Sequence, residues 1–106
     1  MSVEDALTKL LDAGGFVVFD LGDYAEYVQF SREQGHISLM WPAVVPKIDD
    51  AARLAQQLGA RTDLAGDGLY ADFGGDVGAA AQFVDRAFQE IFGRTVFHIN
   101  VRQETD

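Results

Sequence analysis

The chain has 106 residues, of which 48% are hydrophobic, so it is long enough to form one domain with a real core. Seventeen acidic residues against eight basic ones give a net charge of −9, which repels a phosphate backbone and an anionic lipid surface and so predicts no nucleic-acid and no membrane partner. The absence of cysteine excludes disulfides, thiolate nucleophiles and cysteine metal sites.

The ends of the sequence carry no sign of export. The chain begins Met-Ser-Val-Glu-Asp, which is acidic where a secretory signal is basic, and no apolar run approaches ~18 residues. We therefore expect a cytoplasmic protein with a single domain over residues 1–106, in which residues 103–106 form a frayed acidic tail.

The first predicted element is a helix over Val3–Ala13. Ser2 followed by Asp5 resembles a capping box, and apolar residues then recur at helical spacing. The pair Gly14-Gly15 ends the helix.

Three strands then follow with only short turns between them, at residues 16–20, 26–32 and 36–41. The first is apolar at nearly every position, so we expect both of its faces to be covered. The third alternates, with Ile37, Leu39 and Trp41 on one face and His36, Ser38 and Met40 on the other. This pattern predicts a tight antiparallel meander.

The middle of the chain predicts a second helix and a further strand region. Pro42 and Pro46 bracket what we read as an extended crossing segment, after which Asp49 or Asp50 caps a helix that ends at Gly59. Residues 61–73 form either one strand or a short hairpin about residues 66–68. The apolar faces of these elements are Ala51, Leu54, Ala55 and Leu58 in the helix, and Leu69, Ala71 and Phe73 in the strand region.

The last part of the chain predicts a long helix and one strand. Asp76 caps the helix, which continues to Gly93, and residues 95–101 alternate as a strand. Adjacent strands interrupted by helices favour an α+β domain in the order α-βββ-α-β(β)-α-β, with a mainly antiparallel sheet and helices largely on one face. The strand order stays open.

No pattern in the sequence predicts catalysis, a metal or a cofactor. His36 and His98 have no partner histidine at ligand spacing, and Asp20 or Asp72 would have to complete a metal site. The glycine-rich segment 74–78 lacks the lysine of a phosphate-binding loop, and its own aspartate repels phosphate. There is no nucleophile elbow. We therefore expect a protein that is not an enzyme and that binds no metal or cofactor.

Polar and aromatic side chains on two neighbouring strands form a candidate binding surface. The candidates are Tyr27, Gln29 and Ser31 on the second strand and His36, Ser38 and Met40 on the third. Aromatic residues in strands also serve the core, which is the alternative reading. If the helices cover one face of the sheet, these six residues lie on the other face and are available to a partner.

The element order resembles the superfamily that joins YbjN-type proteins with type III secretion chaperones, and within it the TY-Chap domains. Three segments carry the resemblance: Tyr27-Val-Gln-Phe30, Leu58-Gly59 and Ala87-Phe88-Gln-Glu-Ile-Phe-Gly93. The resemblance implies a non-catalytic chaperone-like or adaptor module that binds a peptide segment or a protein, through an open sheet edge or a groove.

The resemblance also implies a homodimer. Phe83 lies away from the main apolar stripe of the long helix, so it belongs either to a dimer surface or to a wide core stripe. Two other functions stay open. An immunity or antitoxin-like protein would use its acidity to cover a basic partner surface. A small-ligand domain would place a pocket near Tyr70 and residues 74–78.

Overall fold

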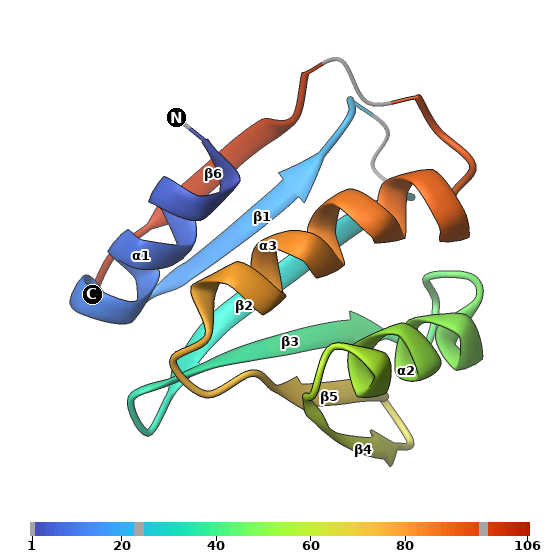
Figure 1. Ribbon diagram of the computed structural model, residues 1–106, viewed down its shortest axis with the longest axis horizontal. Helices are drawn as coiled ribbons and strands as arrows, with labels where there is room; N and C mark the ends of the chain where they lie inside the picture. Colours follow the sequence, from blue (N-terminus) through green and yellow to red (C-terminus); the bar gives the residue numbers. More distant parts are fainter. Residues whose placement is uncertain (1, 23–24, 96–97) are drawn as a thin grey trace.

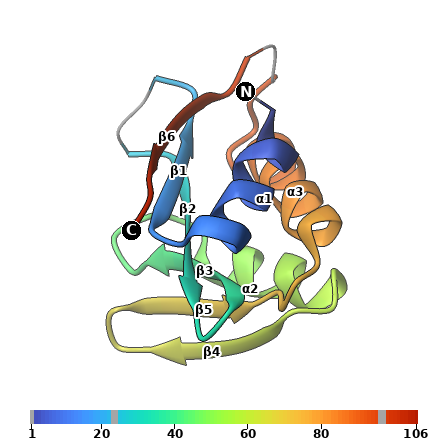
Figure 2. The same cartoon turned by 90° about the vertical axis from the view of Figure 1, so that its left-hand side faces the viewer.

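The computed structural model describes residues 2–22, 25–95 and 98–106 (Figure 1). In chain order the elements are α1 (Val3–Ala13), β1 (Phe16–Asp20), β2 (Tyr27–Glu33), β3 (His36–Pro42), α2 (Ile48–Gln57), β4 (Arg61–Ala65), β5 (Gly68–Asp72), α3 (Val77–Arg86), the π-helical turn η1 (Ala87–Ile91) and β6 (Asn100–Glu104). The strands form one antiparallel sheet in the order β4-β5-β3-β2-β1-β6. The helices lie on one face of it (Figure 2), which confirms the predicted α+β architecture.

The first half of the fold follows from local sequence. The Ser2 hydroxyl accepts a hydrogen bond from the Asp5 amide at 3.1 Å, and α1 ends at Gly14 as predicted. β2 and β3 are joined by Gln34 and Gly35, which both have positive φ, as a type I′ hairpin turn requires. β1 matches its predicted bounds, while β2 begins and ends one residue later and β3 includes Pro42.

The segment after β3 is a turn and not an extended crossing. The Val45 amide donates to the Pro42 carbonyl at 2.9 Å, and the Ala43 amide donates to the Asp67 carbonyl at 3.0 Å. The chain has to leave the sheet here and rise into the helix layer, which buries Val45 and leaves Val44 exposed.

The expected aspartate cap of α2 is also wrong. Lys47 occupies the cap position in the left-handed conformation and makes no side-chain cap bond, while Asp49 and Asp50 lie inside the first turn. The Lys47 ammonium instead donates to the Ile91 carbonyl at 2.7 Å, at the end of η1. A cation is favourable at the C-terminal end of a helix, so this contact ties the start of α2 to the end of η1.

The region 61–73 is a hairpin, β4–β5, which answers the question that the sequence left open. Leu69, Ala71 and Phe73 are buried on one face, as predicted. Thr62 and Leu64 share that face on β4, at the margin of the sheet. Gly59 ends α2 with φ of 89°, also as predicted.

The last strand lies further along the chain than residues 95–101. β6 covers Asn100–Glu104, and residues 96–97 of the predicted strand lie outside the described residues. Gln103 and Glu104 pair with Val17 and Phe16, so the expected frayed tail at 103–106 is wrong for these two residues. Pairing with β1 determines this register, and local alternation could not reveal it.

Phe83 belongs to the core. Its side chain is fully buried, and its ring meets the rings of Phe30, Trp41 and Phe73 with centroids 6.4, 6.1 and 5.8 Å away. Phe83 therefore belongs to a wide core stripe of the helix, and the prediction that it binds a partner or lies on a dimer surface is wrong. A dimer surface on the second face of α3 loses its aromatic residue.

We predict that Phe83→Ala lowers the free energy of unfolding by about 3–5 kcal/mol, because it leaves a cavity where three rings converge. Gln82→Ala, at the adjacent exposed position of α3, is the control and changes it by less than about 0.5 kcal/mol. Urea denaturation followed by tryptophan fluorescence measures both. Equal stabilities for the two variants would contradict the core position.

A second prediction tests the position of β6 against the turn after α1. A Cβ at Gly15, where φ is 85°, would lie 1.9 Å from the Glu104 carbonyl oxygen, whereas a Cβ at Gly59, where φ is 89°, meets nothing within 4 Å. Both alanine variants introduce backbone strain, but only Gly15→Ala also forces β6 away. Gly15→Ala should therefore lower the melting temperature more than Gly59→Ala, and the reverse order would show that β6 does not pack there.

Candidate functional site

One face of the sheet is covered by helices and the other is not. In Figure 2 the helices all lie to one side of the strands, and no described helix covers the opposite side, which we call the open face. Alternation along each strand and the pairing registers place these residues on it: Phe16, Val18, Asp20, Tyr27, Gln29, Ser31, Glu33, His36, Ser38, Met40, Pro42, Arg61, Asp63, Tyr70, Asp72, Asn100, Arg102 and Glu104.

The six remaining candidate residues from the sequence lie on this open face. Ser31 lies directly opposite Ser38, and Gln29 directly opposite Met40. His36 pairs with Glu33 beside the hairpin turn. Tyr27, at the start of β2, is half-buried and also packs against the core. The structure therefore places the six together, and their role in binding stays a prediction.

Seven neighbouring uncharged residues lie in the middle of the open face, beside one charged residue of β5, Asp72. They are Tyr70, Met40, Ser38, Gln29, Ser31, Val18 and Phe16, on β5, β3, β2 and β1, and we call them the central field. Charged residues make up 24% of the chain, so seven adjacent uncharged positions separate this surface from the rest. Phe16 is 36% exposed on it. Sequence reasoning missed Phe16, Val18 and Tyr70 because the strand order was unknown.

Charged residues border the central field on both sides. Arg61 and Asp63 lie on β4, and Arg102 and Glu104 lie on β6. Residues that pair directly across neighbouring strands form rows that run across the whole sheet. Arg61, Ser38 and Glu104 lie in one such row, and Asp63, Met40 and Arg102 lie in the next.

His36 and Asp72 form an exposed hydrogen-bonded pair beside the central field, on β3 and β5. The His36 Nδ1 lies 3.0 Å from the Asp72 Oδ2, and the Gly74 amide donates to the Asp72 Oδ1 at 2.7 Å. The hydrogen bond from His36, followed by that from Gly74, lowers the pKa of Asp72 below its ordinary value of 3.8. Arg61 acts in the same direction.

Asp20 is the buried carboxylate of the open face, with 8% of its surface exposed. Its Oδ1 accepts from the Gly22 amide at 2.9 Å and from Asn100 Nδ2 at 3.2 Å, and its Oδ2 lies 3.4 Å from Arg102 Nε. These partners satisfy the carboxylate and tie β1 to β6. Asp20 therefore has a structural role here.

The structure gives less support to a metal site or a phosphate site. Among the described residues, no three histidine, aspartate or glutamate side chains gather where they could hold a metal ion. His98 is exposed and lies outside the strands. The Asp76 Oδ1 accepts from the Ala79 amide at 2.9 Å, so this carboxylate already occupies the helix start where a phosphate would bind.

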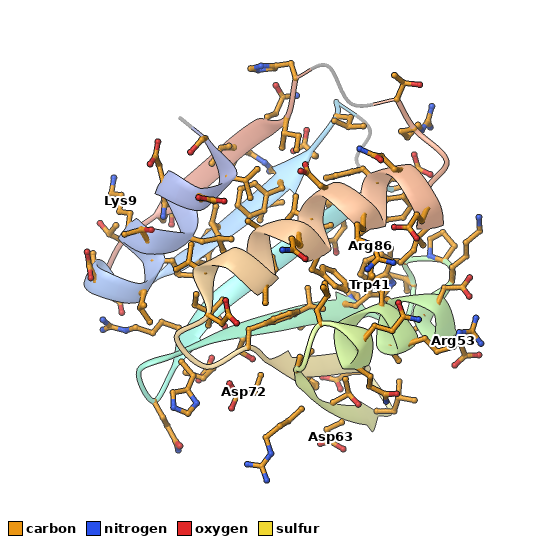
Figure 3. The ribbon with its side chains drawn as sticks, viewed as in Figure 1. Lys9, Trp41, Arg53, Asp63, Asp72 and Arg86 are labelled. Carbon is orange, nitrogen blue, oxygen red and sulfur yellow. The ribbon has the colours of Figure 1, made fainter. Side chains whose placement is uncertain are left out.

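A cavity of about 220 Å³ separates α2 from α3 and η1, away from Tyr70 and residues 74–78. Two ion pairs lie along it, Arg53 with Asp50 and Arg86 with Glu90 (Figure 3). Its volume is below the ~300 Å³ at which ligand pockets begin.

Comparison with known proteins finds no match: no family model, no curated protein and no solved structure matches this chain. The resemblance to YbjN-type proteins and secretion chaperones therefore stays a prediction. Among the described residues, no helix is both long and apolar enough to cross a bilayer.

The electrostatics of Asp72 give a direct prediction. Because its folded pKa is depressed, ionised Asp72 stabilises the fold above the unfolded pKa, and this stabilisation is lost as the pH falls through the folded pKa. His36→Ala should raise the pKa of Asp72 toward 3.8, as measured by NMR titration of the side-chain carboxyl carbons. The pKa of Glu90, which its hydrogen bond from Arg86 lowers, is the internal control and should not move. An unchanged pKa of Asp72 would rule out the pair in solution.

Proposed function

We propose that this protein is a non-catalytic, chaperone-like or adaptor module of the cytoplasm, and that it binds a peptide segment or a protein on the open face. The observation that carries the proposal is the central field. An uncharged surface with aromatic and methionine side chains, bordered by charge, has the composition of a protein interface with its polar rim.

The chemistry of the field supports this proposal. Tyr70, Phe16 and Met40 offer apolar area, and the side chains of Gln29 and the two facing serines offer hydrogen bonds. Aromatic side chains in the middle of an interface contribute much of the binding energy when a partner excludes water from them. An open sheet face with these groups suits a protein surface better than a small molecule.

The sheet edges offer a second mode for the same kind of partner. Within the described parts of the chain, β4 and β6 each pair with one neighbouring strand only, and Leu64 on β4 is 56% exposed. An extended peptide can add to such an edge by backbone hydrogen bonds while its alternate side chains enter adjacent pockets. This mode supports a peptide-binding chaperone.

One alternative has a specific observation in its favour. The net charge of −9 favours association with a basic partner, as an immunity or antitoxin-like protein would require. Such binding would involve one folded basic protein and weaken steeply with added salt. Binding through the uncharged field would depend much less on salt.

Gln29→Lys tests the proposed function. It places a charge in the middle of the field, so burial against a partner would have to desolvate an unpaired ammonium, and we expect capture of the partner to fall about tenfold or more. The measurement is co-purification of the tagged protein with proteins expressed from neighbouring reading frames, quantified by mass spectrometry.

Gln82→Lys is the matched control. It makes the same chemical change at an exposed position of α3, on the helix side of the sheet, and capture should stay at the wild-type level. Circular dichroism and melting temperature establish that both variants fold. If both variants capture a partner as the wild type does, the open face is not the binding surface.

A further inference from the structure

We propose that a second copy of this chain binds the open face, in a two-fold dimer whose axis runs parallel to the strands and passes between β2 and β3. The proposal rests on the proposed function, because it names an occupant of the same surface. In this arrangement β3 of one copy lies over the partner's β2, β5 over β1, and β4 over β6.

The charged margins are complementary to themselves under this rotation. Arg61 shares a row with Glu104, and Asp63 shares the next row with Arg102. Because the rotation exchanges the two margins and keeps each row, Arg61 faces the partner's Glu104 and Asp63 faces the partner's Arg102. Symmetry forms each pair twice. His36, in the row beside the hairpin turn, likewise faces the partner's Glu33.

The middle of the face is compatible with the same arrangement. Met40 lies over the partner's Gln29, Ser38 over the partner's Ser31, and Tyr70 over the partner's Val18. The one charged residue in this part of the face, Asp72, lies over the partner's Phe16 and keeps its hydrogen bonds from His36 and the Gly74 amide. The oppositely charged pairs then fall at the rim, where they orient the two copies and exclude alternative alignments.

The twist of the sheet does not prevent contact. A twisted sheet has the shape of a saddle, and rotation about an axis in its plane along the strands carries the saddle onto a surface of the same hand. Two such faces stay parallel out to their margins, as in aligned sheet packing with ~10 Å between the sheets. Arginine and glutamate side chains can span this separation from opposite sides.

The flat area of the face is below that of a standard interface, and the relief of the side chains brings it closer. Six strands spaced ~4.8 Å apart and about five residues long cover roughly 500 Å² of flat area, which side-chain relief increases. A standard interface buries ~800 Å² on each partner. The net charge of −9 on each copy opposes association, so the dimer should be measured near physiological ionic strength, where the Debye length is ~8 Å.

The first test is the mass in solution, by light scattering and sedimentation equilibrium at the physiological ionic strength of ~0.15 M. We expect a dimer for the wild type. Met40→Lys, which sets an ammonium against the partner in the middle of the interface, should weaken association about a hundredfold. Gln82→Lys should leave the dimer intact.

Charge exchange at the margins makes the test specific to this arrangement. Arg61→Glu should weaken the dimer about tenfold, because two attractive pairs per dimer become repulsive. The double variant Arg61→Glu with Glu104→Arg restores opposite signs across the interface and should restore the dimer. Both positions are exposed, so neither change endangers the fold.

The outcomes separate this proposal from the proposed function. A monomeric wild type, or a dimer that ignores both the Met40 and the Arg61 substitutions, overturns the two-fold arrangement. A monomer whose capture of another protein still depends on Gln29 leaves the open face as a binding surface and removes only the second copy. A monomer that captures nothing overturns both.

Discussion

The contact of Phe83 with three aromatic rings holds the two layers of this fold together. Phe30 comes from β2, Trp41 from β3, and Phe73 from the residue after β5, so one helical side chain joins three neighbouring segments of the sheet. Ring pairs at these edge-on angles contribute beyond their burial. Trp41 also stacks on Phe92, beyond η1, which extends the contact along the helix.

The core lies on the helix-covered face of the sheet, and this affects the open face. The largest fully buried side chains come from the helices and from the strand positions that face them, and no described helix covers the opposite face of the sheet. Charged residues on outer strands discourage random edge pairing. The central field lacks such charges, so it is either a half-buried polar surface without a partner or a binding surface. Its aromatic and methionine side chains favour a binding surface.

The sequence predicts those parts of the fold that local chemistry controls. α1, β1 and Asp76 as the cap of α3 depend on residues within a few positions of each other, and they appear where expected. The cap residue of α2, Lys47, contacts Ile91, 44 positions away, and β6 pairs with a strand some 80 positions earlier. No local pattern encodes such distant contacts.

The same distinction between local and distant contacts applies to the candidate site. Alternation within β2 and β3 was enough to find the half of the open face that these strands carry, because side-chain direction in a strand has a period of two. The margins required the strand order and the register of β6. A slip of β6 by one residue would turn Arg102 and Glu104 toward the helices and replace them with Val101 and Gln103. The sign pattern that makes the open face complementary to itself is therefore a property of long-range pairing, and the bond from Gln103 to the Ala6 carbonyl, at 2.8 Å, helps to hold that register.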